Sequence, residues 1–140
     1  PELAGPLAHT GVPAADWARA RGRFQEVLTI IRLLHQAGVP IVAGTDQAVP
    51  GYSLHRELEL YHQAGFSPME AIEAGTSVPA AAMGLSAQVG TVQPGKRADL
   101  LVVEGNPLER LSDLRRVWLV VTEGRRYQPG PLWRSVGFRE

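Results

Sequence analysis

A single carboxylate at the end of an apolar run is the first feature of this sequence that could do chemistry. The run Val39-Pro40-Ile41-Val42-Ala43 leads into Gly44-Thr45-Asp46, the pattern of a buried strand that carries one acidic side chain at its carboxyl end. In an α/β barrel the carboxyl ends of the strands hold the catalytic side chains. Asp46 is therefore a candidate metal ligand or general base. The alternative is an Asx turn or a helix cap, because aspartate favours such positions after a strand.

A second candidate group lies on the predicted helix over residues 54–63. His55, Glu59 and His62 recur at spacings of four and three, so they share one helix face and could form a compact metal site. The alternative is a solvated, charged helix face, which is a common pattern. His55 stands at the start of the helix, where it could also contact a substrate.

Composition removes several classes of function. The 140 residues hold 14 basic and 14 acidic side chains, a balance that gives no electrostatic case for nucleic acid or anionic membrane as a partner. There is no cysteine, so disulfides, thiolate metal sites and cysteine nucleophiles are excluded. No Gly-x-Ser-x-Gly elbow points to a serine hydrolase. No targeting or membrane-spanning segment is expected, and the cytoplasm is the default location.

The elements that must position these residues read as an α/β unit. After an irregular lead-in over residues 1–13, apolar spacings of three and four predict a helix over 14–36, closed by Gly38. The buried strand 39–43 follows at once, as in a short αβ connection. Three short helices are then predicted, and they cover residues 54–63 with Ser53 as cap, 67–74 with a Ser67-Pro68-x-Glu70 start, and 78–83.

The texture changes near residue 89, where a small β unit is predicted. Strands are expected over 98–103 and 116–122, with a short helix over 108–111 between them. The turn Glu123-Gly124 then predicts a hairpin to a return strand over 125–127. We therefore divide the chain into an α/β part, 1–88, and a β part with a C-terminal tail, 89–140.

Four motifs, in this order, give the chain a family resemblance. They are Val39-Pro40-Ile41-Val42-Ala43-Gly44-Thr45-Asp46, Leu54-His55-Arg56-Glu57-Leu58-Glu59-Leu60, Ser67-Pro68-Met69-Glu70-Ala71-Ile72, and Gly90-Thr91-Val92-Gln93-Pro94-Gly95-Lys96-Arg97-Ala98-Asp99-Leu100. The sequence resembles the amidohydrolase superfamily, in the branch of imidazolonepropionase and the metal-dependent Xaa-Pro dipeptidases. The resemblance implies an α/β fold in which residues 1–88 are the C-terminal part of a (β/α)8 TIM barrel and residues 89–140 supply β-sandwich strands.

The resemblance also implies an activity and a site. The expected function is hydrolysis of an amide or cyclic amide C–N bond in a small-molecule substrate, with a divalent metal, zinc by resemblance. Asp46 matches the aspartate that binds the metal and shuttles a proton at the end of the eighth strand. The His-x-His pair of the family is absent, and the only histidines are His9, His35, His55 and His62.

This departure leaves two hypotheses open for the chain by itself. In the first, the enzyme site is completed by the missing barrel portion or by a homo-oligomer. In the second, the chain is a catalytically silent fragment that folds as an obligate oligomer or interaction module, because a lone parallel strand must find a partner for its sheet edge.

Overall fold

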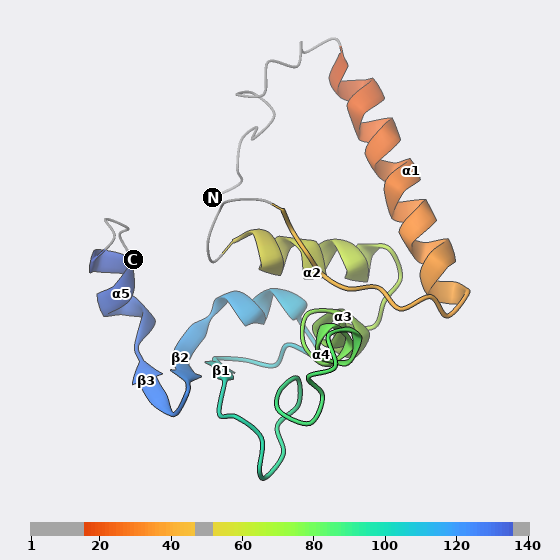
Figure 1. The fold of residues 1–140 in the computed structure, drawn as a ribbon. Coiled ribbons are helices and arrows are strands. Elements are labelled where there is room, and N and C mark those ends of the chain that lie inside the picture. Colours follow the sequence, from red (N-terminus) through yellow and green to blue (C-terminus); the bar gives the residue numbers. More distant parts are fainter. Residues whose placement is uncertain (1–15, 47–51, 136–140) are drawn as a thin grey trace.

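The computed structural model describes residues 16–46 and 52–135. The predicted lead-in over 1–13 and most of the loop after Asp46 lie outside the described residues. Within them, the chain forms helices α1 to α4, a small sheet interrupted by the 3₁₀ helix η3, and a last helix α5 (Figure 1). None of the described helices combines the length and the apolar character that a bilayer crossing needs.

Helix α1, Trp17–Gln36, ends as the sequence predicts. Gly38 has a φ of 76°, and the N–H of Val39 donates to the carbonyl of Leu34 at 3.0 Å, which together close the helix with a Schellman motif. Its predicted core face, however, is only partly covered. Leu28 is buried, whereas Phe24 and Val27 keep 40% and 50% of their surface exposed. The described residues cover one edge of this helix and leave the rest open.

The predicted strand over residues 39–43 is wrong in this structure. Residues 39–46 belong to no strand, and they run alongside α2 after the turn at the end of α1 (Figure 1). The N–H of Ala43 donates instead to the carbonyl of Ala74, at 2.8 Å. A strand is defined by pairing with a neighbour, and no described residue offers a parallel neighbour here.

Helices α2, Ser53–Gln63, α3, Pro68–Ala74, and α4, Ser77–Ala82, confirm the three short helices. The predicted capping box of α3 is present, since Ser67 Oγ accepts from the N–H of Glu70 and the Glu70 carboxylate accepts from the N–H of Ser67. The cap predicted at Ser53 is wrong. Tyr52 stands at the N-cap of α2 without a side-chain cap bond, and Ser53 is already helical.

The hydrophobic core lies where α2 meets α3 and η3. Its buried members are Leu58, Tyr61, Phe66, Ala71, Ala74 and Leu111. Ala71 is fully buried, so α3 approaches closely through small side chains. Ile31 of α1 and Ile41 and Ala43 of the following segment pack against the same cluster. The core therefore joins the segment that leads to Asp46 to the second and third helices.

Truncation of the central leucine should test this core. We expect Leu58→Ala to lower the free energy of unfolding by about 2–5 kcal/mol, because it removes buried methyl groups and leaves a cavity. Leu101→Ala, at a side chain with 47% of its surface exposed, should cost much less. Urea unfolding followed by circular dichroism measures both variants, and equal losses would contradict this assignment of the core.

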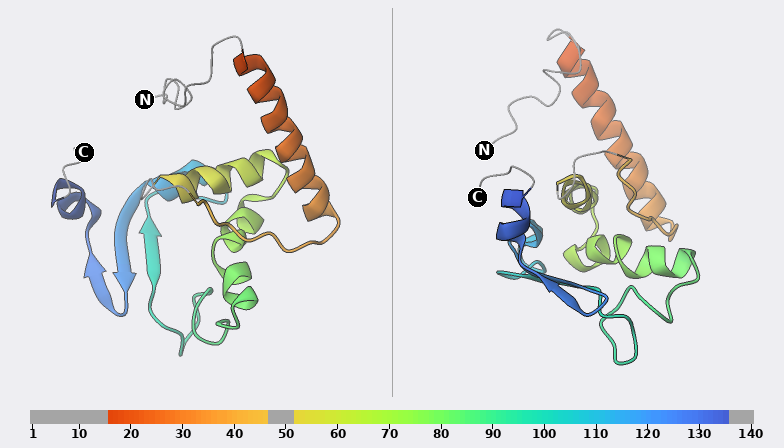
Figure 2. Two further views of the ribbon diagram at one scale, coloured as in Figure 1. Left: turned by 45° about the horizontal axis from the view of Figure 1, so that its top comes forward. Right: turned by 60° about the vertical axis from the view of Figure 1, so that its left-hand side comes forward.

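The β part is one antiparallel sheet of three strands in the order β1-β2-β3 (Figure 2). Strands β1, Leu100–Val103, β2, Val117–Thr122, and β3, Arg125–Tyr127, lie within the predicted ranges. The hairpin turn is confirmed, since Glu123 and Gly124 have φ values of 49° and 77°, as both central residues of a type I′ turn require. Helix α5, Pro129–Ser135, was not predicted and contacts β2.

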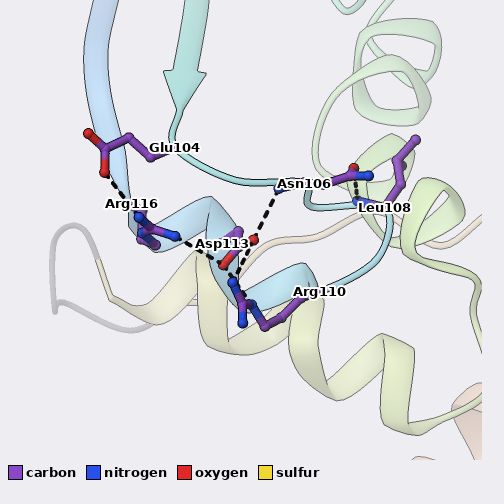
Figure 3. A network of polar contacts seen from close by, with 6 residues as sticks. All are labelled: Glu104, Asn106, Leu108, Arg110, Asp113 and Arg116. Carbon is purple, nitrogen blue, oxygen red and sulfur yellow. Dashed lines mark hydrogen bonds and ion pairs between the residues drawn. The ribbon is translucent and has the colours of Figure 1, made fainter.

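The helix predicted over residues 108–111 is wrong, and a buried carboxylate explains why. Asn106 forms a turn in which its side-chain oxygen accepts from the N–H of Leu108, and the 3₁₀ helix η3, Leu111–Arg115, begins only afterwards. Asp113 of η3 accepts from the N–H of Asn106 at 3.1 Å and from Nε of Arg110 at 2.8 Å (Figure 3). Asp113 thereby fixes the loop between β1 and η3.

Gly105 makes this approach of Asp113 possible. A Cβ at Gly105 would stand 2.2 Å from Oδ2 of Asp113. Gly105 also has a backbone φ of 106°, which residues other than glycine rarely adopt. The hydrogen bonds from Arg110, and then the N–H of Asn106, hold the pKa of Asp113 below its usual range despite the burial of its side chain.

This lowered pKa predicts an acid dependence of stability. A carboxyl group whose pKa is lower in the folded than in the unfolded chain stabilises the fold above the unfolded pKa, about 3.9, and loses that contribution as pH falls toward the folded pKa. Asp113→Asn should therefore be less stable than the parent at neutral pH, with a gap that narrows below about pH 4. Thermal unfolding across that pH range, with exposed Glu26→Gln as control, checks the result. A gap that widened in acid would contradict it.

Candidate functional site

Asp46 lies at the end of the described segment that follows α1, and its side chain is exposed. Its backbone φ is 43°, in the left-handed region that aspartate tolerates better than most residues. The chain thus turns at Asp46 and presents its carboxylate to solvent. An exposed carboxylate at a turn is free to accept a proton or to ligate a cation that other residues help to hold.

Two hydrogen bonds from neighbouring residues fix the backbone just before Asp46. The N–H of Ala43 donates to the last carbonyl of α3, and the N–H of Gly44 donates to Oε1 of Glu57 on α2 at 3.1 Å. The same Oε1 accepts the hydroxyl proton of Tyr61 at 2.5 Å. Glu57 and Tyr61 lie four residues apart on α2, so the helix itself brings their side chains together.

Glu57 is the residue of this site that sequence reasoning missed. Its i, i+4 spacing to Tyr61 was the only available signal, and many helical pairs with that spacing share no such contact. Burial, with the adjacent Glu57 carboxylate, raises the pKa of Tyr61 well above its usual value, so the phenol stays a hydrogen-bond donor. Oε2 of Glu57 is buried and has no hydrogen-bond partner among the described residues, an arrangement that typically costs roughly 1–3 kcal/mol.

The structure does not bring His55, Glu59 and His62 together as a metal site. Within residues 16–46 and 52–135, no group of three or more histidine, cysteine, aspartate or glutamate side chains could hold a metal ion. Glu59 accepts instead from Nε of Arg115 at 2.7 Å and from Nη1 of Arg56 at 3.2 Å. His62 donates its Nδ1–H to the carbonyl of Phe66 at 2.7 Å, which occupies one of its two ring nitrogens.

Glu59 and Arg115 form a bridge between α2 and η3 rather than a ligand set. Burial raises the pKa of Glu59, but the hydrogen bonds from Arg115 and Arg56 outweigh burial and hold that pKa below its usual range. The Arg115 guanidinium also lies 4.5 Å from the ring centroid of Tyr52, within reach of a cation–π interaction. On the face of α2 that sequence alone left open between metal site and charged surface, Glu59 forms ion pairs with Arg56 and Arg115.

His55 lies beside this bridge and is half-buried. Burial lowers its pKa below 6.5, the positive charge of Arg115 lowers it further, and Glu59 opposes both. The imidazole is consequently neutral at pH 7. A neutral ring can accept or donate one hydrogen bond, which is compatible with the predicted substrate contact and does not test it.

The cause of the His55 shift can be tested directly. Arg115→Gln should raise the pKa of His55, because it removes a repelling positive charge and leaves Glu59 with one fewer cation beside it. Titration of the imidazole proton resonances by NMR measures the change. Arg97→Gln, which breaks an ion pair with Asp99 in the β part, is the matched control and should leave His55 unchanged. A fall in the pKa of His55 on loss of Arg115 would refute this account.

The chain belongs to the amidohydrolase family. The sequence profile of the Amidohydrolase family matches residues 6–126, which includes the Gly-Thr-Asp segment and the Gly-Lys-x-Ala-Asp-Leu motif before β1. The family resemblance predicted from four motifs is thereby confirmed. Members of this family generally bind divalent metals.

Two named relatives and one further solved structure show how the chain is related. Ochratoxinase of Aspergillus niger is 34% identical over 104 residues, which cover 73% of this chain and 22% of that protein. Its crystal structure matches with a TM-score of 0.69 over 89% of this chain and 30% of that chain. A Xaa-Pro dipeptidase with bound methionine in its active site matches with a TM-score of 0.67 and 31% identity, over 73% of this chain and 25% of that one.

Imidazolonepropionase of Geobacillus kaustophilus is 40% identical over 77 residues, covering 51% of this chain and 18% of that protein. The chain thus spans about a fifth to a third of the relatives it matches. The chain has an α/β arrangement with a small antiparallel sheet, and most of it superposes on the ochratoxinase and Xaa-Pro dipeptidase structures.

Proposed function

We propose that this chain is part of a metal-dependent hydrolase that cleaves an amide or cyclic amide C–N bond in a small-molecule substrate. The family match over residues 6–126 carries the proposal, because it includes the segment that ends in the exposed Asp46. Hydrolases among the relatives, such as ochratoxinase, support the reaction class. Substrate selection would come from loops elsewhere in the protein, so no particular amide is assigned.

In this proposal residues 1–88 are the C-terminal part of a (β/α)8 barrel, and residues 89–140 contribute strands to a β-sandwich. The exposed apolar side chains of α1, together with Val39 and Val42 of the next segment, support it, since a barrel would cover them. The remaining barrel portion is the proposed cover. The alternative is a catalytically silent chain that forms an oligomer and covers these side chains with further copies of itself. The exposed apolar side chains of α1 support this alternative as much as they support the barrel.

A divalent metal, zinc in our proposal, requires more ligands than the described residues offer. Catalytic zinc sites use three protein ligands, and Asp46 is the one candidate that the structure leaves exposed at the end of a fixed segment. The residues described therefore do not fit a complete metal site, and the other ligands would come from outside them. When bound, such a metal supplies positive charge that acidifies water and polarises a carbonyl.

The part that this chain plays in the chemistry is proton transfer. The Asp46 carboxylate would accept a proton from the attacking water and then deliver it to the leaving nitrogen of the amide. An exposed carboxylate at the end of an anchored segment suits both steps. His55, neutral at pH 7, would contact the substrate from the start of α2 in the same proposal.

Substitution of Asp46 in the full-length protein tests the proposal. Asp46→Asn keeps the shape of the side chain but removes the base, so kcat for amide hydrolysis should fall by about 10²–10⁴-fold. Glu73→Gln, at an exposed residue of α3, is the control and should retain the parental rate. Steady-state kinetics on dipeptides ending in proline, N-acyl amino acids and small cyclic amides provides the measurement.

Removal of metal belongs to the same experiment. A chelator should abolish hydrolysis, and zinc should restore it in the parent but not in Asp46→Asn. Metal-free parental protein that hydrolyses at an unchanged rate would contradict the metal requirement. An Asp46→Asn protein with parental kcat would contradict the role of Asp46.

A further inference from the structure

We propose that Glu57 is the positioning residue for Asp46, an inference that rests on the hydrolase function proposed above. Glu57 holds the backbone two residues before Asp46 from the side of α2. It touches neither substrate nor metal in this proposal, and acts only through the place and direction that it gives to Asp46.

The backbone of the segment that leads to Asp46 is anchored by two helices. Residues 39–46 have no paired strand beside them in the described part of the chain, so their polar groups must find partners on helices. The N–H of Ala43 donates to the carbonyl of Ala74, one of the last carbonyls of α3, which a helix cannot pair internally. The N–H of Gly44 takes the Glu57 carboxylate at 3.1 Å. Two consecutive N–H groups thus tie the segment to two different helices.

Glu57 is itself held in place. Tyr61, one turn later on α2, donates its hydroxyl to Oε1 of Glu57 at 2.5 Å and lies 3.5 Å from the carbonyl oxygen of Val42. Tyr61 is buried and stacks with Phe66 at 5.3 Å between ring centroids. The core therefore fixes Tyr61, Tyr61 orients Glu57, and Glu57 fixes Gly44.

The anchored residue Gly44 lies close in the chain to the Asp46 carboxylate. Two residues span at most about 7 Å of chain, so a hold at Gly44 restricts where Asp46 can lie. Asp46 itself has a φ of 43° and is exposed. Misplacement of a catalytic group by about 1 Å can cost about 10²-fold in rate. Because Glu57 anchors Gly44, only two residues before Asp46, the contact can control a shift of this size.

A contribution to stability does not by itself explain a carboxylate at position 57. Its Oε2 is buried without a partner among the described residues, although a carboxylate is costly to bury unpaired. A buried polar atom without a partner needs an explanation other than stability, and service to the neighbouring Asp46 supplies one.

The test compares two substitutions in the protein at its natural length. Glu57→Ala removes the acceptor of the Gly44 N–H, and we expect kcat to fall about 10–100-fold with KM changed less than about threefold. Glu57→Gln keeps an oxygen that accepts from both Gly44 and Tyr61, and should restore kcat to within about fivefold of the parent. Hydrogen exchange of the Gly44 amide, followed by NMR, should be faster in Glu57→Ala than in the parent and in Glu57→Gln.

The matched control is Asp113→Ala. Asp113 also accepts a backbone N–H, that of Asn106 at 3.1 Å, but it lies in η3, and none of its hydrogen bonds or ion pairs among the described residues reaches residues 39–46. Asp113→Ala should lower the stability of the fold while kcat per folded molecule stays unchanged.

If Glu57→Ala and Asp113→Ala reduce kcat equally, or if Glu57→Ala keeps both parental kcat and slow Gly44 exchange, the positioning role is overturned. A parent protein with no amide hydrolysis at all overturns the proposed function as well, whereas an active parent with an unaffected Glu57→Ala overturns only the role of Glu57.

Discussion

The backbone of residues 39–46 has no neighbouring strand among the described residues, and the rest of the structure around Asp46 depends on how that shortage is met. A buried N–H without a partner is costly, so this segment must lie where acceptors exist. One acceptor is the end of α3 and the other is the Glu57 carboxylate on α2. The position of Asp46 is consequently a property of the contact between helices, rather than of a sheet.

Helix α2 serves this contact through side chains that reach three neighbours. Leu58 and Tyr61 enter the core against α3 and η3, and Glu57 reaches the Gly44 backbone. Glu59 pairs with Arg115 across to η3, at 2.7 Å. A single helix therefore connects the candidate catalytic segment to the β part, which explains why a charged face with the spacing of a metal site forms ion pairs instead.

The loop before η3 uses the same solution at another place. Asp113, like Glu57, accepts a backbone N–H from a segment that has no strand partner at that point, and an arginine fork completes it (Figure 3). The two carboxylates differ in how their charge is met. Asp113 has Arg110 beside it, whereas Glu57 has the Tyr61 hydroxyl and one buried oxygen that finds no partner within residues 16–46 and 52–135. The difference is the reason that we assign a structural role to the first and a positioning role to the second.

By itself the sequence determined the local elements and the family. Periodicity, the Ser67-Glu70 capping box and the Glu123-Gly124 turn are local rules, so the first four helices and the hairpin followed from residues close together in the chain. Four motifs in order, from the Gly-Thr-Asp segment to the Gly-Lys-x-Ala-Asp-Leu motif, also indicated the amidohydrolase family, which the family match confirms. Only the tertiary structure decided the partners of distant groups. The predicted strand 39–43 lacked a neighbour, Glu59 met Arg115 at a separation of 56 residues, and Glu57 met Gly44 across 13. Such pairings depend on which surfaces pack together, and packing is a property of the whole fold that no short stretch of sequence contains.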